Sequence, residues 1–181
     1  IERILAGDTQ SFSCLVAKYE KMAYTIALRI LENREEAEEA VQDAFVKMYR
    51  ALSDFHFDSK FSTWFYRIVY RTALTALRQQ RMFVSYEEAG PVDLSNDEVE
   101  SATALLERGD RKEMIARTLK KLPADEALLL TLYYLEECSV EEICQITELS
   151  ASNVKVKLFR GRKRFYEVLQ DKMKLETADL L

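Results

Sequence analysis

The sequence has few of the residues that interrupt helices or build strands. Its 181 residues include four Gly and two Pro, and no alternating run rich in Val, Ile and Thr points to a sheet. Leu, Ala, Glu, Lys and Arg are abundant, and these residues favour helix interiors. We therefore expect an all-α fold.

Cysteine and histidine are also scarce, which argues against disulfide and zinc sites. Cys14, Cys138 and Cys144 form no CxxC pair and are odd in number, so we expect reduced thiols in a cytosolic protein. His56 is the single histidine, so the usual Cys and His ligands of a zinc site are missing. We expect neither a metal nor a cofactor.

Segments that would enter a membrane are missing too. No apolar run approaches the ~20 residues that cross a bilayer, and the sequence does not open with a basic segment followed by an apolar one. Hydrophobic residues make up 48% of the chain, which is typical of a globular protein. These features predict a soluble, cytoplasmic protein that does not insert into membranes.

What the sequence does have is an uneven distribution of charge. Acids exceed bases by 31 to 26, for a net charge of −5, and Arg108 is the one base in residues 83–108. The acids there are Glu87, Glu88, Asp93, Asp97, Glu98, Glu100 and Glu107. Together with Gly90-Pro91 they are typical of a loose linker, with a short helix near residues 99–106. We therefore divide the chain into two small helical domains, 1–82 and 109–181, joined by a flexible acidic linker at 83–108.

Both domains show the period of buried helices. Between residues 12 and 30 apolar side chains recur at spacings of three and four, which predicts a buried helical stripe. A second helix is expected over residues 34–52 with an acidic outer face, and a third over residues 62–81, with Ser62 or Thr63 as its N-cap. In the second domain we expect a helix over residues 111–122 and another opening at Pro123, which a first helical turn accepts.

Two further helices form a helix-turn-helix pattern. Ser139 followed by Glu142 fits a capping box and predicts a short helix over residues 140–147. Ser150 caps the next helix after a brief turn. A short helix, a turn of three or four residues and a second capped helix are the layout of a helix-turn-helix.

The second of these helices has an apolar face and a basic face. At 100° per residue, the apolar face consists of Val154, Leu158, Gly161, Phe165 and Leu169. Gly161 would allow another helix to approach closely. The opposite face consists of Ser152, Lys155, Val156, Phe159, Arg160 and Lys163, with Lys157 and Arg164 at its edges. A basic helix is often only a solvated surface, but after a capped turn this one is expected to enter the major groove of DNA.

Aromatic residues lie among cations in the first domain. The stretch "KFSTWFYRIVYR" places Trp64, Phe65, Tyr66 and Tyr70 beside arginines. Such a mixture suits single-stranded nucleic acid, whose unpaired bases stack on aromatic rings. A helix facing a core also carries aromatic residues, so both readings stay open.

In this order the motifs resemble a bacterial sigma factor of the extracytoplasmic-function (ECF) group, the compact type with only the second and fourth conserved regions. "AEEAVQDAFVKMYRAL" resembles the helix of region two that binds RNA polymerase. "FSTWFYRIVYRTALTALR" resembles the segment that melts and reads the −10 element. "LPADEALLLTLYYLEECSVEEICQITELSASNVKVKLFRGRKRF" resembles region four, which reads the −35 element.

The resemblance implies roles for individual residues. It implies a polymerase contact at or near Glu39, Gln42, Asp43, Phe45 and Lys47. It implies that the unpaired −10 strand is lined by Lys60, Phe61, Ser62, Thr63, Trp64, Arg67, Tyr70 and Arg71, with a flipped base at the loop of residues 52–60. It implies that −35 DNA faces Ser152, Asn153, Lys155, Val156, Lys157, Phe159 and Arg160.

The sequence departs from the family pattern at places that affect promoter choice. Arg71 and Thr75 stand where the family often has Asn and Asp, and Ser152-Asn153 stands where a Gly-Thr pair is common. These changes leave the fold untouched but leave the promoter sequence unpredicted.

The resemblance also implies partners: core RNA polymerase, promoter DNA (duplex at −35, single-stranded at −10), and an anti-sigma factor, membrane-anchored or free. One alternative is a stand-alone regulator of duplex DNA, which would lack the Trp64–Arg71 cluster and carry a receiver domain with strands. Another is an enzyme, but we find no Gly-rich phosphate loop, metal cluster or nucleophile with a paired base. We expect no enzymatic activity, because the polymerase supplies the catalysis.

Overall fold

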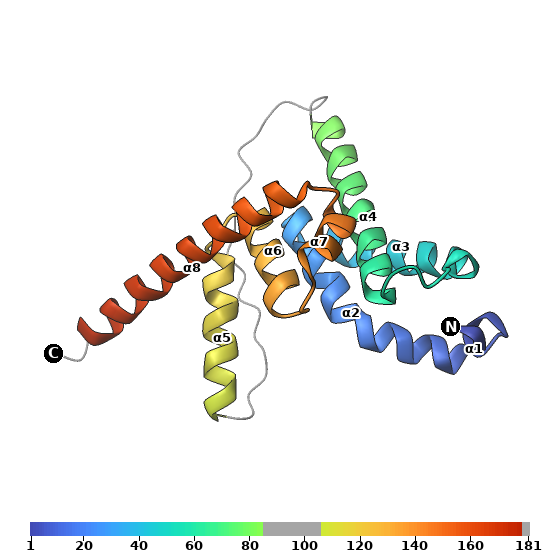
Figure 1. Cartoon of the computed structure of the whole chain (residues 1–181), viewed down its shortest axis with the longest axis horizontal. Helices are drawn as coiled ribbons and strands as arrows, with labels where there is room; N and C mark the ends of the chain where they lie inside the picture. Colours follow the sequence, from blue (N-terminus) through green and yellow to red (C-terminus); the bar gives the residue numbers. More distant parts are fainter. Residues whose placement is uncertain (85–105, 179–181) are drawn as a thin grey trace.

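The computed structural model describes residues 1–84 and 106–178, and both ranges are helical without a strand (Figure 1). The all-α prediction is confirmed. The first half holds α1 (Glu2–Leu5), α2 (Thr9–Leu31), α3 (Arg34–Arg50), a 3-10 turn (Leu52–Asp54) and α4 (Phe61–Val84). The second half holds α5 (Leu106–Lys120), α6 (Ala124–Tyr134), α7 (Val140–Thr147) and α8 (Ala151–Ala178). Most of the expected linker and of the short helix near residues 99–106 lies outside the described residues. Within the two described ranges, no helix has the length and apolar character needed to cross a bilayer.

Helices α2, α3 and α4 pack together in the first half. Side-chain caps start two of them: Asp8 accepts from the backbone N–H of Ser11, and Asn33 accepts from that of Glu36. Each contributes an apolar stripe to a shared core, where Ile26, Phe65 and Val69 are fully buried. Such stripes are what the spacing of three and four predicted.

The start of α4 differs from the prediction. Neither Ser62 nor Thr63 is its N-cap, because the helix begins earlier, at Phe61. The backbone N–H of Trp64 already donates to the carbonyl of Lys60 at 3.1 Å. Thr63 is 2% exposed and uses its hydroxyl for a contact with the second half of the chain. A sequence window cannot reveal that contact, since its partner lies 79 residues away.

The helix-turn-helix has the predicted form. Ser139 and Glu142 make the reciprocal capping box of α7, and Ser150 accepts from the backbone N–H of Asn153 at the start of α8. A Cβ atom on Gly161 would lie 3.2 Å from the side chain of Leu130, so the expected close approach of another helix is confirmed, and that helix is α6. Pro123 is the N-cap of α6, one position before the first helical turn where we expected it.

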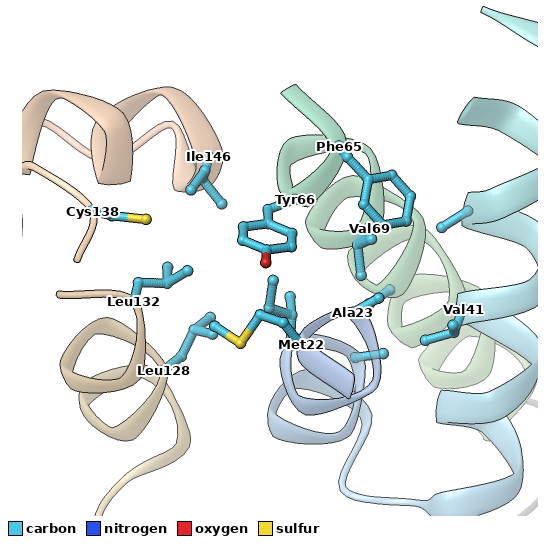
Figure 2. Close-up of a cluster of buried hydrophobic side chains, with 14 of the residues drawn as sticks. Met22, Ala23, Val41, Phe65, Tyr66, Val69, Leu128, Leu132, Cys138 and Ile146 are labelled. Carbon is cyan, nitrogen blue, oxygen red and sulfur yellow. The ribbon is translucent and has the colours of Figure 1, made fainter. Parts of the chain in front are cut away.

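The two halves share one hydrophobic core. α7 lies against α4, and α6 lies against α2 (Figure 1). Figure 2 shows Tyr66 of α4 surrounded by Leu128 and Leu132 of α6, Ile146 of α7 and Cys138. Tyr66 is 2% exposed, and Leu132 and Ile146 are fully buried. The sequence predicted two domains and a linker, but it did not indicate that the domains pack together.

Candidate nucleic-acid and polymerase interfaces

The outer side of α8 is open to solvent. We call the expected −35 residues the α8 face: Ser152, Asn153, Lys155, Val156, Lys157, Phe159 and Arg160. All are exposed except Lys157, which is half-buried. Phe159 is 64% exposed and Val156 47%, while Val154 and Leu158 on the opposite side are buried. Exposed apolar side chains can contact thymine methyl groups, and the cations beside them can bind phosphates.

The edge of this face is held by α6. Lys157 forms an ion pair with Asp125 and is therefore partly engaged within the protein. Burial tends to raise the pKa of Asp125, but the ammonium group of Lys157 outweighs it and the pKa is lowered. Farther along, Arg164 lies 3.7 Å from the buried carboxylate of Glu126. These pairs link α8 to α6. Of the cations on the α8 face, Lys155 and Arg160 form no ion pair among the described residues.

The aromatic residues of α4 are divided between the core and the surface. We call the expected −10 residues the α4 face: Lys60, Phe61, Ser62, Thr63, Trp64, Arg67, Tyr70 and Arg71. Phe65 and Tyr66 are buried core residues. Trp64 is half-buried, with its ring 5.0 Å from that of Phe55 and 5.6 Å from that of Phe61. Trp64 therefore belongs to an aromatic cluster that borders the exposed arginines.

The loop before α4 carries an aromatic residue that sequence reasoning missed. Leu52 and Phe55 are buried and anchor the loop, whereas Phe57 is 66% exposed. Phe57 has φ of 61°, a left-handed conformation that is unusual for a bulky residue. Its ring lies 4.8 Å from that of Phe55. The alternation in "FHFDS" is the only signal that could have marked it as an exposed aromatic beside a buried one.

Carboxylates from the second half pair with the cations of the α4 face. Glu142 lies 3.0 Å from the ammonium group of Lys60 and accepts from Thr63 at 3.3 Å. Glu148, at the end of α7, accepts from Nε of Arg71 at 2.8 Å and from Arg67 at 3.4 Å. The buried hydroxyl of Tyr66 donates to Glu136 at 2.9 Å. We call these three glutamates, Glu136, Glu142 and Glu148, the acidic clasp.

These contacts change the acidity of the groups involved. Arg71 and then Arg67 lower the pKa of Glu148. Burial acts to raise the pKa of Glu142, but the backbone N–H of Ser139 and the charge of Lys60 outweigh it, and that pKa is lowered. The hydrogen bond to Glu142 in turn raises the pKa of Lys60. Each group is thus held in its charged form, as expected for opposite charges in contact.

The outer side of α3 presents acidic and apolar groups. We call the expected polymerase residues the α3 face: Glu39, Gln42, Asp43, Phe45 and Lys47. All but Phe45 are exposed, and Lys47 donates to Thr72 at 3.3 Å. Phe45 is 8% exposed and its ring lies 4.7 Å from that of Phe65, so most of the side chain packs in the core, and what remains lines a hollow. Val46 and Tyr49, which are about half exposed, border a hollow with Phe12 and were not singled out from the sequence.

Comparison with known proteins identifies the family. The family model described as Sigma-70 region 2 matches residues 15–82, and the one described as Sigma-70, region 4 matches residues 112–165. The chain is 32% identical over 177 residues to the RNA polymerase sigma-H factor of Pseudomonas aeruginosa, covering 94% of this chain and 92% of that protein. It is 30% identical over 170 residues to the ECF RNA polymerase sigma-E factor of Escherichia coli K12, covering 90% and 88%. This chain belongs to the ECF group of sigma factors.

Solved structures share the fold of this sigma factor. The sigma factor RpoE in complex with the anti-sigma factor NepR from Bartonella quintana matches with a TM-score of 0.71 at 18% identity, covering 89% of this chain and 98% of that one. CnrH in complex with the cytosolic domain of CnrY matches with a TM-score of 0.58 at 23% identity, covering 92% of both chains.

Membership in the family establishes the activity. As a sigma factor, the chain binds core RNA polymerase and directs promoter-specific transcription initiation, and it is not an enzyme. The region 2 match spans the α3 and α4 faces, and the region 4 match spans the whole α8 face. The acidic clasp lies inside the region 4 match and touches residues inside the region 2 match.

Proposed function

We propose that this sigma factor reads its promoter with two separate surfaces. The α8 face enters the major groove at −35, and the α4 face with the loop of residues 52–60 holds the unpaired −10 strand. The observation that carries this proposal is the division of α8: Val154 and Leu158 are buried, while Phe159 and Arg160 stand exposed on the other side. A recognition helix requires one side buried against its domain and an opposite side that exposes basic and apolar residues.

At −35 the α8 face combines positioning with base contact. Lys155 and Arg160 supply the charge that phosphates or guanine edges accept, and Val156 and Phe159 supply apolar contacts for thymine methyl groups. Ser152 and Asn153 lie in the first turn of α8, where side chains reach base edges in helix-turn-helix proteins.

At −10 the α4 face acts by differential binding. Phe57 and Trp64 offer rings for unpaired bases, and Arg67 and Arg71 offer charge for the strand backbone. A surface that binds single strand better than duplex shifts the equilibrium toward the melted promoter. Binding at −35 and to the polymerase raises the effective concentration of this weaker contact.

Two partner proteins complete the proposal. The exposed residues of the α3 face dock on core RNA polymerase in the cytoplasm, where the enzyme acts. An anti-sigma factor, membrane-anchored or free, controls the protein by covering its polymerase and DNA surfaces. The solved relatives described as complexes with NepR and CnrY support this part of the proposal.

Transcription from genomic fragments of the host tests whether the α8 face is needed to recognise the promoter. Core polymerase with this sigma factor should give new start sites, and Lys155→Glu with Arg160→Glu should abolish them while polymerase binding persists. Lys121→Glu, an exposed charge reversal outside the three faces, serves as the matched control. Sequence-specific duplex binding without any polymerase-dependent start site would contradict the proposal.

A further inference from the structure

The contacts between α7 and α4 fall on the residues proposed to hold the −10 strand. Four members of the α4 face, Lys60, Thr63, Arg67 and Arg71, are bonded to Glu142 or Glu148. Lys60 and Arg71 are 11 positions apart, so the clasp grips both ends of a stretch roughly 16 Å long on a helix that rises ~1.5 Å per residue. The cations that phosphates need are therefore already paired with anions.

Between these two ion pairs, apolar side chains pack α7 against α4. Ile146 of α7 is fully buried and lies beside Tyr66 of α4, as Figure 2 shows. The hydroxyl of Tyr66 reaches Glu136, the third glutamate of the clasp. The contact thus has an apolar centre with charged pairs around it, which is the usual anatomy of a specific protein interface.

The α8 face has no such contact with glutamates. Its two apolar residues, Val156 and Phe159, are about half and two-thirds exposed, and its cations Lys155 and Arg160 are exposed as well. The side chains of the α4 cations also remain 45–67% exposed, but they are ion-paired, whereas neither Lys155 nor Arg160 forms an ion pair among the described residues. Of the two faces, only the α4 face therefore has its cations paired with the glutamates of the clasp.

We propose that the acidic clasp is an autoinhibitory contact in which Glu142 and Glu148 occupy the positions of −10 strand phosphates, so that α4 binds unpaired DNA only after α7 has moved away. This inference rests on the proposed function of the α4 face. The closed chain can still present α8 to duplex DNA. Its apparent affinity for single strand is reduced by the fraction of molecules that are open.

The backbone at Glu148 makes a clean test possible. Glu148 ends α7 in the left-handed conformation, with φ of 62°, which Asn and Gly adopt more readily than Glu. Glu148→Asn therefore removes the carboxylate and places at the end of α7 a residue that adopts the left-handed conformation at least as readily as Glu. Glu142→Gln removes the second charge and retains a residue that can complete a capping box. Glu32 ends α2 with φ of 56° and lies outside the clasp, so Glu32→Asn is the matched control.

Cys138 reports on opening without any ligand. It is 6% exposed beside the contact between the halves (Figure 2), and burial raises the pKa of its thiol to about 11. Opening should expose the thiol and lower its pKa, and both changes speed alkylation. The charge of Glu142 also helps to raise this pKa, so Glu142→Gln lowers it even in a closed chain, and Glu148→Asn is the variant whose Cys138 rate reports on opening alone. Pulse alkylation of the full chain with iodoacetamide, read peptide by peptide in a mass spectrometer, uses exposed Cys14 as the internal reference.

The variants should increase the fraction of molecules in which α7 has moved away from α4, in proportion to the charges removed. We expect Cys138 to react about threefold faster in Glu148→Asn and about tenfold faster in the double variant with Glu142→Gln, since surface ion pairs contribute little singly and more as a group. Glu32→Asn should behave as the unsubstituted protein. Equal Cys138 rates in the double variant and the unsubstituted protein would overturn the proposal.

Strand binding completes the test. The probe is a fluorescein-labelled single-stranded DNA of mixed sequence, about 12 nucleotides long, a length in the range such surfaces cover. The double variant should bind it about tenfold more tightly than the unsubstituted protein and Glu32→Asn should not, since apparent affinity follows the open fraction. Faster Cys138 alkylation without tighter strand binding would overturn the proposal.

Failure of the clasp and failure of the proposed function give different results. If Arg71→Ala abolishes the new start sites but the double variant gains no strand affinity, the α4 face binds DNA and the clasp does not regulate it. If Arg71→Ala leaves those start sites unchanged, the assignment of the α4 face is wrong, and the clasp proposal falls with it.

Discussion

The α4 and α8 faces are built from similar residues and lie in opposite surroundings. Each joins arginine and lysine to large apolar side chains, and each is assigned to DNA by the same resemblance. α7 packs against α4 and places glutamates on the cations of the first, which we call the covered face, although those cations stay partly exposed. On the second, the exposed face, Lys155 and Arg160 have no ion pair among the described residues. Residue type alone therefore does not decide whether the cations of such a surface are already paired, and the acidic helix beside α4 makes the difference.

The kind of DNA that each surface is proposed to bind gives a reason for the difference. Duplex DNA at −35 exists before the polymerase arrives, so an exposed reading helix is useful at once. Unpaired DNA at −10 exists only after melting begins. Under the proposed autoinhibition, pairing with the glutamates keeps the α4 face from binding stray single-stranded nucleic acid in the meantime. Such electrostatic binding requires little sequence specificity.

The largest effect on this comparison should come from Ile146, which lies beside Tyr66 at the covered face. Ile146→Ala should lower the free energy of unfolding by about 3 kcal/mol, as is usual for truncating a fully buried aliphatic side chain. Val156→Ala is the matched change at the exposed face and should stay within about 0.5 kcal/mol. Chemical denaturation measures both. A loss at Ile146 as small as that at Val156 would show that α7 is not packed on α4 in solution.

Gly161 tests how firmly the exposed α8 face is seated. A Cβ there would meet Leu130 at 3.2 Å and Glu126 at 3.3 Å, so Gly161→Val forces α8 away from α6. We expect a loss of about 2 kcal/mol in unfolding free energy, typical of overpacking, together with weaker −35 duplex binding. Lys163→Val places the same side chain at an exposed position of α8 and should have little effect on stability. A neutral Gly161→Val would mean that α8 can shift without cost.

The hydroxyls of Tyr66 and Tyr166 allow the stability contributions of the covered and exposed faces to be compared. Tyr66→Phe removes the hydrogen bond to Glu136 at the covered face and should cost about 1 kcal/mol of unfolding free energy, the usual net contribution of such a bond. Tyr166→Phe removes a hydroxyl from a side chain of α8 that is 60% exposed and should change stability by less than about 0.5 kcal/mol. Thermal denaturation of the two variants side by side gives the difference directly. Equal losses would contradict a specific role for the Tyr66 hydroxyl.

Features encoded locally were predictable from the sequence. The capping box of Ser139 and Glu142, the cap at Ser150 and the close approach at Gly161 all depend on neighbouring positions, or on which face of one helix a residue occupies. Periodicity also marked the α8 face correctly as the side opposite Val154 and Leu158. These are short-range rules, and one sequence is enough to apply them.

Features that depend on the contact between the halves were not predictable. Thr63 was expected to cap α4, but it donates to a glutamate 79 residues away. Phe45 stays a predicted polymerase residue, but no pattern within α3 shows that its ring packs against Phe65, because the outward side of α3 is set by how α3 packs on α4. Glu142 was recognised as a capping residue, and no local pattern shows that its carboxylate also reaches Lys60. Long-range pairing of charges leaves no periodic signal.

The smallest predicted effect is a pH dependence of the contact between α7 and α4. Arg71 lowers the pKa of Glu148, and Ser139 and Lys60 lower that of Glu142, so both carboxylates are more acidic in the closed chain than a free glutamate with pKa 4.5. A lowered pKa stabilises the closed form above that ordinary value, and the stabilisation is lost as pH falls through the lowered pKa values. We expect the radius of gyration from small-angle X-ray scattering to rise slightly as pH falls from 6 toward about 4. The double variant Glu142→Gln, Glu148→Asn should lack this rise, since it has no clasp carboxylate at either position. An equal rise in both proteins would place the pH-sensitive groups elsewhere and separate acid expansion from the contrast between the two faces.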